Sequence, residues 1–243
     1  MRSMIRQSWR KSADADYLKE SCMKRMIAFM NRLKMITALC AAVLLGGCGM
    51  STTVPEPADP SAAPAVSDTV TITNLVDFNV LQETADLSGY RWMNDPNPAF
   101  TEISLQESIR FFTEGGSGIL VYSAETCPFC NRAMPVLNTI LKEKGVKAYY
   151  VDTNMPIASD SATSMAIYNE LVTHIESIFE TNDEGERIFQ IPEVIAIKDG
   201  QIVGHHLSLV DSFTITDEDA QMNEAEVKEL SDIYRGLIDA CAD

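Results

Sequence analysis

The sequence is short of basic residues over most of its length. It carries 19 Lys and Arg against 35 Asp and Glu, a formal net charge of −16. Residues 1–47 hold nine of the basic residues and three of the acidic ones, which leaves 10 basic and 32 acidic residues in the rest of the chain. Nucleic-acid binding needs clustered Lys and Arg. The composition therefore excludes nucleic acid as a partner and predicts repulsion from anionic lipid headgroups unless the chain is tethered.

The apolar run at 35–45 is too short to span a bilayer. It has 11 residues, whereas a spanning helix needs about 20. Four basic residues precede it: Lys24, Arg25, Arg32 and Lys34. A positive flank followed by a short apolar core is typical of a signal peptide. We therefore predict a signal-peptide region at 1–47, with Met23 or Met30 as alternative translation starts.

The end of this run, Leu45-Gly46-Gly47-Cys48, resembles the bacterial lipobox. That resemblance implies cleavage before Cys48 and acylation of its thiol. Two or more acyl chains give a stable anchor, because each buried CH₂ contributes roughly 0.8 kcal/mol. The expected location is the extracytoplasmic face of the bacterial cell membrane. The alternative is an uncleaved buried helix in which Cys48 is incidental.

Residues 49–68 contain no aromatic residue and are rich in Pro, Ala, Ser and Thr. Such a segment buries too little apolar surface to fold, so we predict a lipid-anchored flexible linker at 48–68. An N-terminal extension at 69–99 and a folded domain at 100–243 follow it. The extension is expected to pack on the domain or to cover a binding groove through four apolar residues, Ile72, Leu75, Val76 and Phe78.

Cysteines are too few for a disulfide scaffold. The chain has six: Cys22, Cys40 and Cys48 in the targeting segment, and Cys127, Cys130 and Cys241 beyond it. A zinc site needs four ligands, and the remaining candidates form no second closely spaced pair: Cys241, His174, His205 and His206. We expect no metal and no cofactor. Half of a zinc site and a static structural disulfide stay open as alternative roles for the Cys127–Cys130 pair.

Strand and helix patterns alternate after residue 100. Ser104 and Glu107 form a capping-box pattern, apolar residues recur at helical spacing, and Lys198-Asp199-Gly200 is a hairpin signal. Strands are predicted at 100–104, 118–124, 147–151, 194–197 and 201–204, and helices at 105–114, 128–144, 165–180 and 223–240. The order β-α-β-α-β-α-β-β-α predicts an α/β domain with a central mixed sheet flanked by helices.

Cys127-Pro128-Phe129-Cys130 lies between a buried strand and the start of a helix. The thiolate is the form that attacks a disulfide. Free backbone N–H groups and the dipole at a helix N-terminus stabilise that charge and lower the pKa of Cys127 from about 8.5. The spacing of three residues places Cys130 one helical turn further, within bonding reach. We predict that Cys127 is the nucleophile and Cys130 the resolving thiol.

The segment 124–130, followed by Pro135, resembles the active site of thioredoxins, and 191–200 is similar to their cis-proline strand and hairpin. The resemblance covers about residues 100–208 and the terminal helix. It implies a thioredoxin fold with catalytic Cys127 and Cys130. It also implies a substrate-binding edge formed by Ile191 and Pro192 together with Pro128 and Phe129 from the dithiol loop.

The sequence departs from the thioredoxin pattern in several places. Thr126 replaces a Trp, and Pro-Phe between the cysteines resembles glutaredoxins. Val121 and Ala148 replace a buried Asp and its Lys partner, which removes the family's usual general base. Glu125 and Glu193 are the candidates to replace it. The 153–190 segment is also longer than in compact members, as either a partner surface or a tolerated insertion.

These observations predict a cofactor-free thiol–disulfide oxidoreductase that acts on exported proteins or peptides and is served by a separate redox partner. The lipobox and the CPFC sequence together resemble the bacteriocin transport accessory proteins of Gram-positive bacteria. That resemblance implies an alternative, an accessory lipoprotein that binds a peptide or transporter and whose redox chemistry is incidental. A redox sensor without turnover is a third possibility. The direction of exchange, whether reduction, oxidation or isomerisation, is open.

Overall fold

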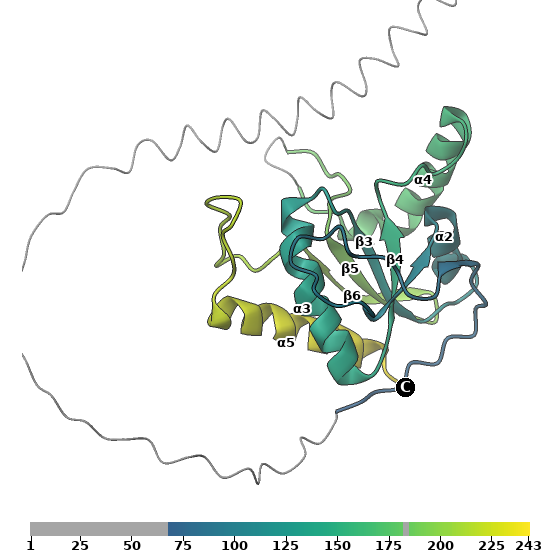
Figure 1. Ribbon diagram of the computed structural model, residues 1–243. Helices are drawn as coiled ribbons and strands as arrows, with labels where there is room; N and C mark the ends of the chain where they lie inside the picture. The colour runs from purple at the N-terminus through teal and green to yellow at the C-terminus, as the bar shows by residue number, and fades with distance from the viewer. Residues whose placement is uncertain (1–67, 182–184) are drawn as a thin grey trace, which may run out of the picture. The chain divides into compact units, whose positions relative to one another are not determined.

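The computed structural model describes residues 68–181 and 185–243. The signal-peptide region, Cys48 and most of the linker lie outside the described residues. The elements are β1 (Val80–Gln82), β2 (Phe100–Ile103), α2 (Leu105–Thr113), β3 (Gly118–Ser123), α3 (Pro128–Lys144), β4 (Ala148–Asp152), α4 (Ser161–Ile175), the 3₁₀ turn η1 (Glu176–Ile178), β5 (Glu193–Lys198), β6 (Gln201–Leu207) and α5 (Glu224–Cys241) (Figure 1). Within this described part, no helix is both long enough and apolar enough to cross a membrane.

The six strands form one mixed sheet in the order β1-β2-β4-β3-β5-β6. Strands β2, β4 and β3 are parallel, whereas β5 is antiparallel to β3 and β6 is antiparallel to β5. A parallel βαβ unit is thus followed by an antiparallel hairpin and a terminal helix. The predicted thioredoxin fold is confirmed by this order of elements.

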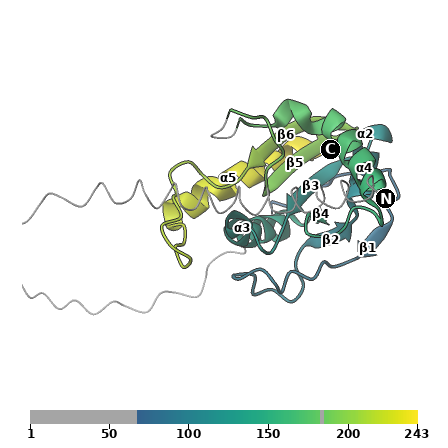
Figure 2. The ribbon, with the colours of Figure 1, turned by 90° about the horizontal axis from the view of Figure 1, so that it is seen from above.

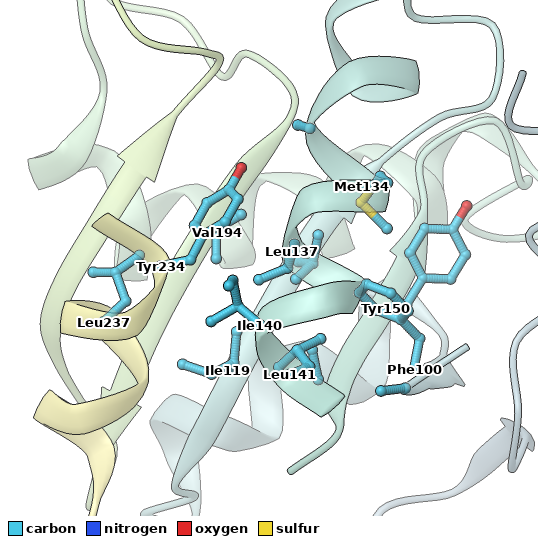
Figure 3. Close-up of a cluster of buried hydrophobic side chains, with 14 of the residues drawn as sticks. Phe100, Ile119, Met134, Leu137, Ile140, Leu141, Tyr150, Val194, Tyr234 and Leu237 are labelled. Carbon is cyan, nitrogen blue, oxygen red and sulfur yellow. The ribbon is translucent and has the colours of Figure 1, made fainter. Parts of the chain in front are cut away.

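Helices cover both faces of the sheet. Helices α3 and α5 pack on one face, and α2 and α4 pack on the other (Figure 2). The central strand β3 is buried along its whole length, and its side chains alternate between the two faces as strand geometry requires. Ile119 and Val121 join the core under α3 and α5, part of which is drawn in Figure 3, and Leu120 and Tyr122 join the core under α2 and α4.

The start of α3 is fixed by the dithiol sequence itself. Cys127 is the N-cap, with an extended backbone, and Pro128 occupies the first helical position, where a missing N–H leaves no hydrogen bond unmade. The helix ends at Gly145, whose φ of 71° is the left-handed conformation that glycine adopts without a Cβ penalty. The sequence therefore places both cysteines at the exposed end of a helix that is otherwise packed on the sheet.

Three predicted boundaries are wrong by three residues or more. Helix α4 begins at Ser161 rather than 165, because Asp160 caps it by accepting hydrogen bonds from the backbone N–H groups of Ala162 and Thr163. It ends at Ile175, where the chain tightens into η1. Strand β6 continues to Leu207, three residues beyond the predicted end, because its pairing with β5 continues that far.

Residues 68–99 wrap along both faces of the sheet. Strand β1 pairs antiparallel with β2 and forms the sheet edge. Val76 and Phe78 are buried in the core under α2 and α4, whereas Tyr90 is buried in the core under α3 and α5. Leu75 is 89% exposed, so its predicted packing on the domain is wrong. The extension thus brings side chains to the α3 side of the sheet, where the cysteines lie.

Candidate active site

The two cysteines lie in opposite environments. Cys127 is half-buried, and Cys130 is fully buried. The Cys127 Sγ accepts a hydrogen bond from the backbone N–H of Cys130 at 3.3 Å. Hydrogen bonds from Cys130 and from the Phe129 backbone lower the pKa of Cys127, against the opposing effect of its partial burial. Burial and the neighbouring Cys127 raise the pKa of Cys130. The arrangement can therefore present one thiolate to a substrate while it keeps the second thiol protonated.

The proline loop lies directly against the reactive thiol. The Ile191–Pro192 peptide bond is cis, and the carbonyl oxygen of Ile191 lies 3.7 Å from the Cys127 Sγ. Pro192 is buried, and its own carbonyl accepts a hydrogen bond from the backbone N–H of Ser208. The backbone before the proline is thus held beside the sulfur, where an extended peptide can pair with it.

The other predicted substrate-binding residues are accessible. Pro128 is exposed and Phe129 is 42% exposed, both at the first turn of α3. Both follow Cys127 in the chain, and the Ile191 carbonyl oxygen lies beside the same sulfur. A peptide that approaches this thiol can therefore meet Pro128 and Phe129 directly, whereas buried Pro192 can act only by positioning Ile191.

Neither predicted replacement for the missing acid contacts the dithiol. Glu193 lies on β5 next to Val194, and because Val194 faces α3 and α5, alternation turns Glu193 toward the opposite face. There its Oε1 is 3.1 Å from His205 Nδ1, and burial, with Glu180 adding to it, raises the pKa of Glu193 to about 8. Glu125 is exposed and its side chain lies against Gly89. Both candidates are therefore poor bases for Cys130.

The space around Cys130 holds hydroxyl groups instead. A hydrogen bond with Ser123 lowers the pKa of Cys130. The Tyr90 hydroxyl donates to Ser123 Oγ at 2.8 Å, and the Tyr150 hydroxyl lies 3.1 Å from that of Tyr90. All three residues are at least 96% buried. The sequence analysis missed this cluster. Its members come from β3, β4 and the extension, and no local pattern links Tyr90 to residues 33 and 60 positions away.

A buried arginine links two neighbouring segments to the dithiol loop. Arg132 is 4% exposed and donates hydrogen bonds to the carbonyl oxygens of Pro128, Ala220 and Glu218. Its guanidinium lies 4.6 Å from the ring centroid of Trp92, a cation–π distance. The loop at 217–220 and the extension are thereby fixed to the first turn of α3. This arrangement also lacked a sequence signal.

The candidate zinc ligands lie in unrelated surroundings. Cys241 is buried, and its thiol donates to the carbonyl oxygens of Gly118 and Ile197. His174 stacks on Phe112, with ring centroids 5.2 Å apart. Within residues 68–181 and 185–243, His, Cys, Asp and Glu side chains form no group of three or more that could hold a metal ion.

Comparisons with known proteins find similarity among solved structures. No family model matches the sequence, and no curated protein matches it. Among solved structures, the chain is similar to the thioredoxin from Aeropyrum pernix, with a TM-score of 0.31 and 18% identity over 55% of this chain and 86% of that one. The assignment of the thioredoxin fold follows from the strand order and connections of the sheet.

Proposed function

We propose that this chain is a thiol–disulfide oxidoreductase that acts on exported proteins or peptides. The observation that carries the proposal is the contrast between Cys127 and Cys130. One thiol is accessible and has a lowered pKa, and the other is buried three residues away and has a raised pKa. Nucleophilic attack needs a thiolate within reach of a substrate, and resolution needs a second thiol that does not compete for the first step.

The reaction proceeds in two exchanges. The Cys127 thiolate attacks one sulfur of a substrate disulfide, and the other substrate sulfur leaves as a thiolate. Cys130, once deprotonated, attacks Cys127 Sγ and releases the second substrate thiol, so the substrate gains two electrons and the Cys127–Cys130 disulfide forms. The same steps in reverse oxidise a substrate dithiol. A separate redox partner then restores the starting state.

The backbone at Ile191 is the proposed substrate-binding edge. Its carbonyl oxygen lies 3.7 Å from Cys127 Sγ, so a peptide strand that pairs there brings its disulfide to the thiolate. Main-chain hydrogen bonds of this kind bind an extended peptide with little dependence on its sequence. The exposed Phe129 ring offers an apolar contact beside the same sulfur.

We further propose that the domain is anchored at the extracytoplasmic face of the membrane through acylated Cys48. The lipobox-like sequence before Cys48 supports this location. The domain's excess of acidic residues disfavours direct lipid binding, so a tether is needed. Expression of Cys48→Ser in bacteria should shift the protein from the membrane fraction to the soluble fraction. Unchanged membrane retention would contradict the anchor.

Turnover measurements test the enzymatic role. Cys127→Ser should abolish reduction of a model protein disulfide in the presence of dithiothreitol, because it removes the nucleophile. Cys130→Ser should accumulate a mixed disulfide on Cys127, detectable as an added mass. Cys241→Ala is the matched control and should keep full activity. Catalysis by Cys127→Ser at the original rate would refute the proposal.

A further inference from the structure

Resolution of the mixed disulfide requires Cys130 to lose a proton in a fully buried place. Cys130 is 0% exposed, and burial raises its pKa. In the mixed disulfide, Cys127 carries no charge and cannot accept that proton. Glu193 faces the other side of the sheet, and Glu125 lies against Gly89. The proton therefore needs another route out of the core.

The hydroxyl cluster offers a continuous route. Ser123 lies on the same face of β3 as Val121, the α3 side, and a hydrogen bond with it lowers the pKa of Cys130 against the effect of burial. Tyr90 donates to Ser123 Oγ at 2.8 Å, and the Tyr150 hydroxyl is 3.1 Å from that of Tyr90. A hydroxyl group both donates and accepts and rotates to suit its partners. With Tyr90 donating to Ser123, the Ser123 hydrogen is free to point at the Cys130 sulfur and stabilise its thiolate. If each hydroxyl of the cluster instead donates in the opposite direction, Ser123 can accept a proton from the Cys130 thiol.

Carboxyl groups lie at the outer end of this route. In the sheet register, Ser123 pairs with Asp152 and Tyr150 pairs with Glu102. Paired residues point to the same face, so both carboxyl groups share the face of α3 with the hydroxyl chain. Burial raises the pKa of Tyr150 most, and the charges of Asp152 and Glu102 raise it further.

One more titratable group faces Cys130, and it does not belong to the hydroxyl cluster. Tyr234 on α5 is fully buried, and its hydroxyl has no hydrogen-bond partner among the described residues. In Figure 3 the hydroxyls of Tyr234 and Tyr150 point toward the same end of α3, on opposite sides of Met134. The groups around Cys130 are then Cys127 from α3, Tyr90 from the extension, Tyr150 from β4 and Tyr234 from α5.

We propose that Ser123, Tyr90 and Tyr150 form a proton path that activates Cys130, a role that rests on the proposed oxidoreductase function. The Cys130 proton passes to Ser123 as the Ser123 proton passes to Tyr90, the Tyr90 proton to Tyr150, and the Tyr150 proton to one carboxylate, that of Asp152 or of Glu102. The Cys130 thiolate then attacks Cys127 Sγ, the Cys127–Cys130 disulfide forms, and the departing thiolate takes a proton from solvent. Ser123 touches the reacting thiol, and Tyr90 acts through Ser123.

A single-turnover reaction with dithiobis(nitrobenzoate) separates the two steps. The full chain carries Cys22→Ser, Cys40→Ser and Cys48→Ser, so that stray thiols do not react. Attack by Cys127 releases the first nitrothiobenzoate, and attack by Cys130 on the mixed disulfide releases the second. We expect Tyr90→Phe to slow the second release at least about tenfold at pH 7, within the range of proton-transfer catalysis, and to move its pH profile upward. The first release should not change.

Two further variants make the result specific. Ser123→Ala breaks the path at its first hydroxyl and should match Tyr90→Phe. Tyr234→Phe removes another buried hydroxyl near Cys130 and should leave both releases at the parent rate. A second release within twofold of the parent rate in both Tyr90→Phe and Ser123→Ala would overturn the proton path. A parent protein that gives no second release would overturn the oxidoreductase function itself.

Discussion

At the scale of single residues, the N-cap position gives Cys127 and Cys130 their different properties. A cap residue points its side chain at the first free backbone N–H groups of the helix, and here that side chain is the Cys127 sulfur, which accepts from the Cys130 N–H. Cys130 belongs to the first turn and points into the core. One helix start thereby produces an accessible thiol that favours the thiolate and a buried thiol that disfavours it.

Glu193 provides a test by pH at this scale. Its pKa is raised to about 8 by burial, well above the value of about 4.3 for a solvated glutamate. Between about pH 5 and pH 8 the folded state holds a proton that the unfolded state has lost, so folding stability falls as pH rises through this window. Glu193→Gln stays neutral and should escape the loss.

Urea unfolding at pH 5 and pH 8.5 measures this effect. We expect the stability of Glu193→Gln relative to the parent to rise by about 1–3 kcal/mol between the two values. The control is Glu180→Gln, since Glu180 is exposed and acts on Glu193 only through its charge. The stability of Glu180→Gln relative to the parent should change by much less between the same two pH values. Parallel pH curves for Glu193→Gln and the parent would show that Glu193 is ionised in the fold.

The sequence predicted the dithiol but not what surrounds its buried member. Cys127 and Cys130 are three residues apart, so a local motif is enough to identify them. Ser123 and Tyr90 meet only through the folded sheet and the extension, 33 residues apart in the chain. Glu193 was a reasonable candidate base from its place next to Pro192, but the strand alternation turns its carboxyl away.

At the scale of elements, the first turn of α3 is held by the segments packed on it. Arg132 donates to the carbonyl oxygens of Pro128 and of the 217–220 loop, and it packs on Trp92. A buried guanidinium has five donors in a fixed plane, which suits several carbonyl oxygens at once. The loop, the extension and the dithiol turn therefore form one structural unit.

Arg132→Met tests this unit. The variant keeps the aliphatic stem but removes the donors, so we expect a loss of about 1–3 kcal/mol in unfolding free energy and faster hydrogen exchange at 217–222. Arg235→Met is the matched control, because Arg235 forms partly exposed ion pairs with Glu143 and Asp232, which contribute at most about 1 kcal/mol. Equal losses in both variants, with unchanged exchange in the loop, would contradict the account.

Element order after residue 100 could be predicted because each segment carries its own periodicity and cap. Two features were not predicted, the start of α4 and the strand β1, and both have physical reasons. The first turn of α4 is exposed and shows no apolar pattern, so its start depended on the Asp160 cap. Strand β1 has three residues and lies at the sheet edge. Such a short segment has too few positions for alternation to be recognised.

At the scale of the whole molecule, the proposed function combines an acidic domain that carries a dithiol with a proposed lipid anchor at Cys48. The acidic surface disfavours anionic partners, and the linker predicted at 48–68 would let an anchored domain reach substrates away from the membrane. The direction of exchange depends on the reduction potential of the Cys127–Cys130 pair. Potentials in this fold class range from about −270 mV for a reductant to about −120 mV for an oxidant.

The most direct test is an equilibrium titration of the Cys127–Cys130 pair. The full chain with Cys22→Ser, Cys40→Ser and Cys48→Ser is equilibrated in glutathione buffers of graded ratio, and the fraction of free thiol is measured by alkylation and mass. We predict one reversible two-electron transition that disappears in Cys130→Ser. Its midpoint would assign the direction, reducing near about −270 mV and oxidising near about −120 mV. A pair that shows no reversible transition in any buffer would contradict the central claim of disulfide exchange.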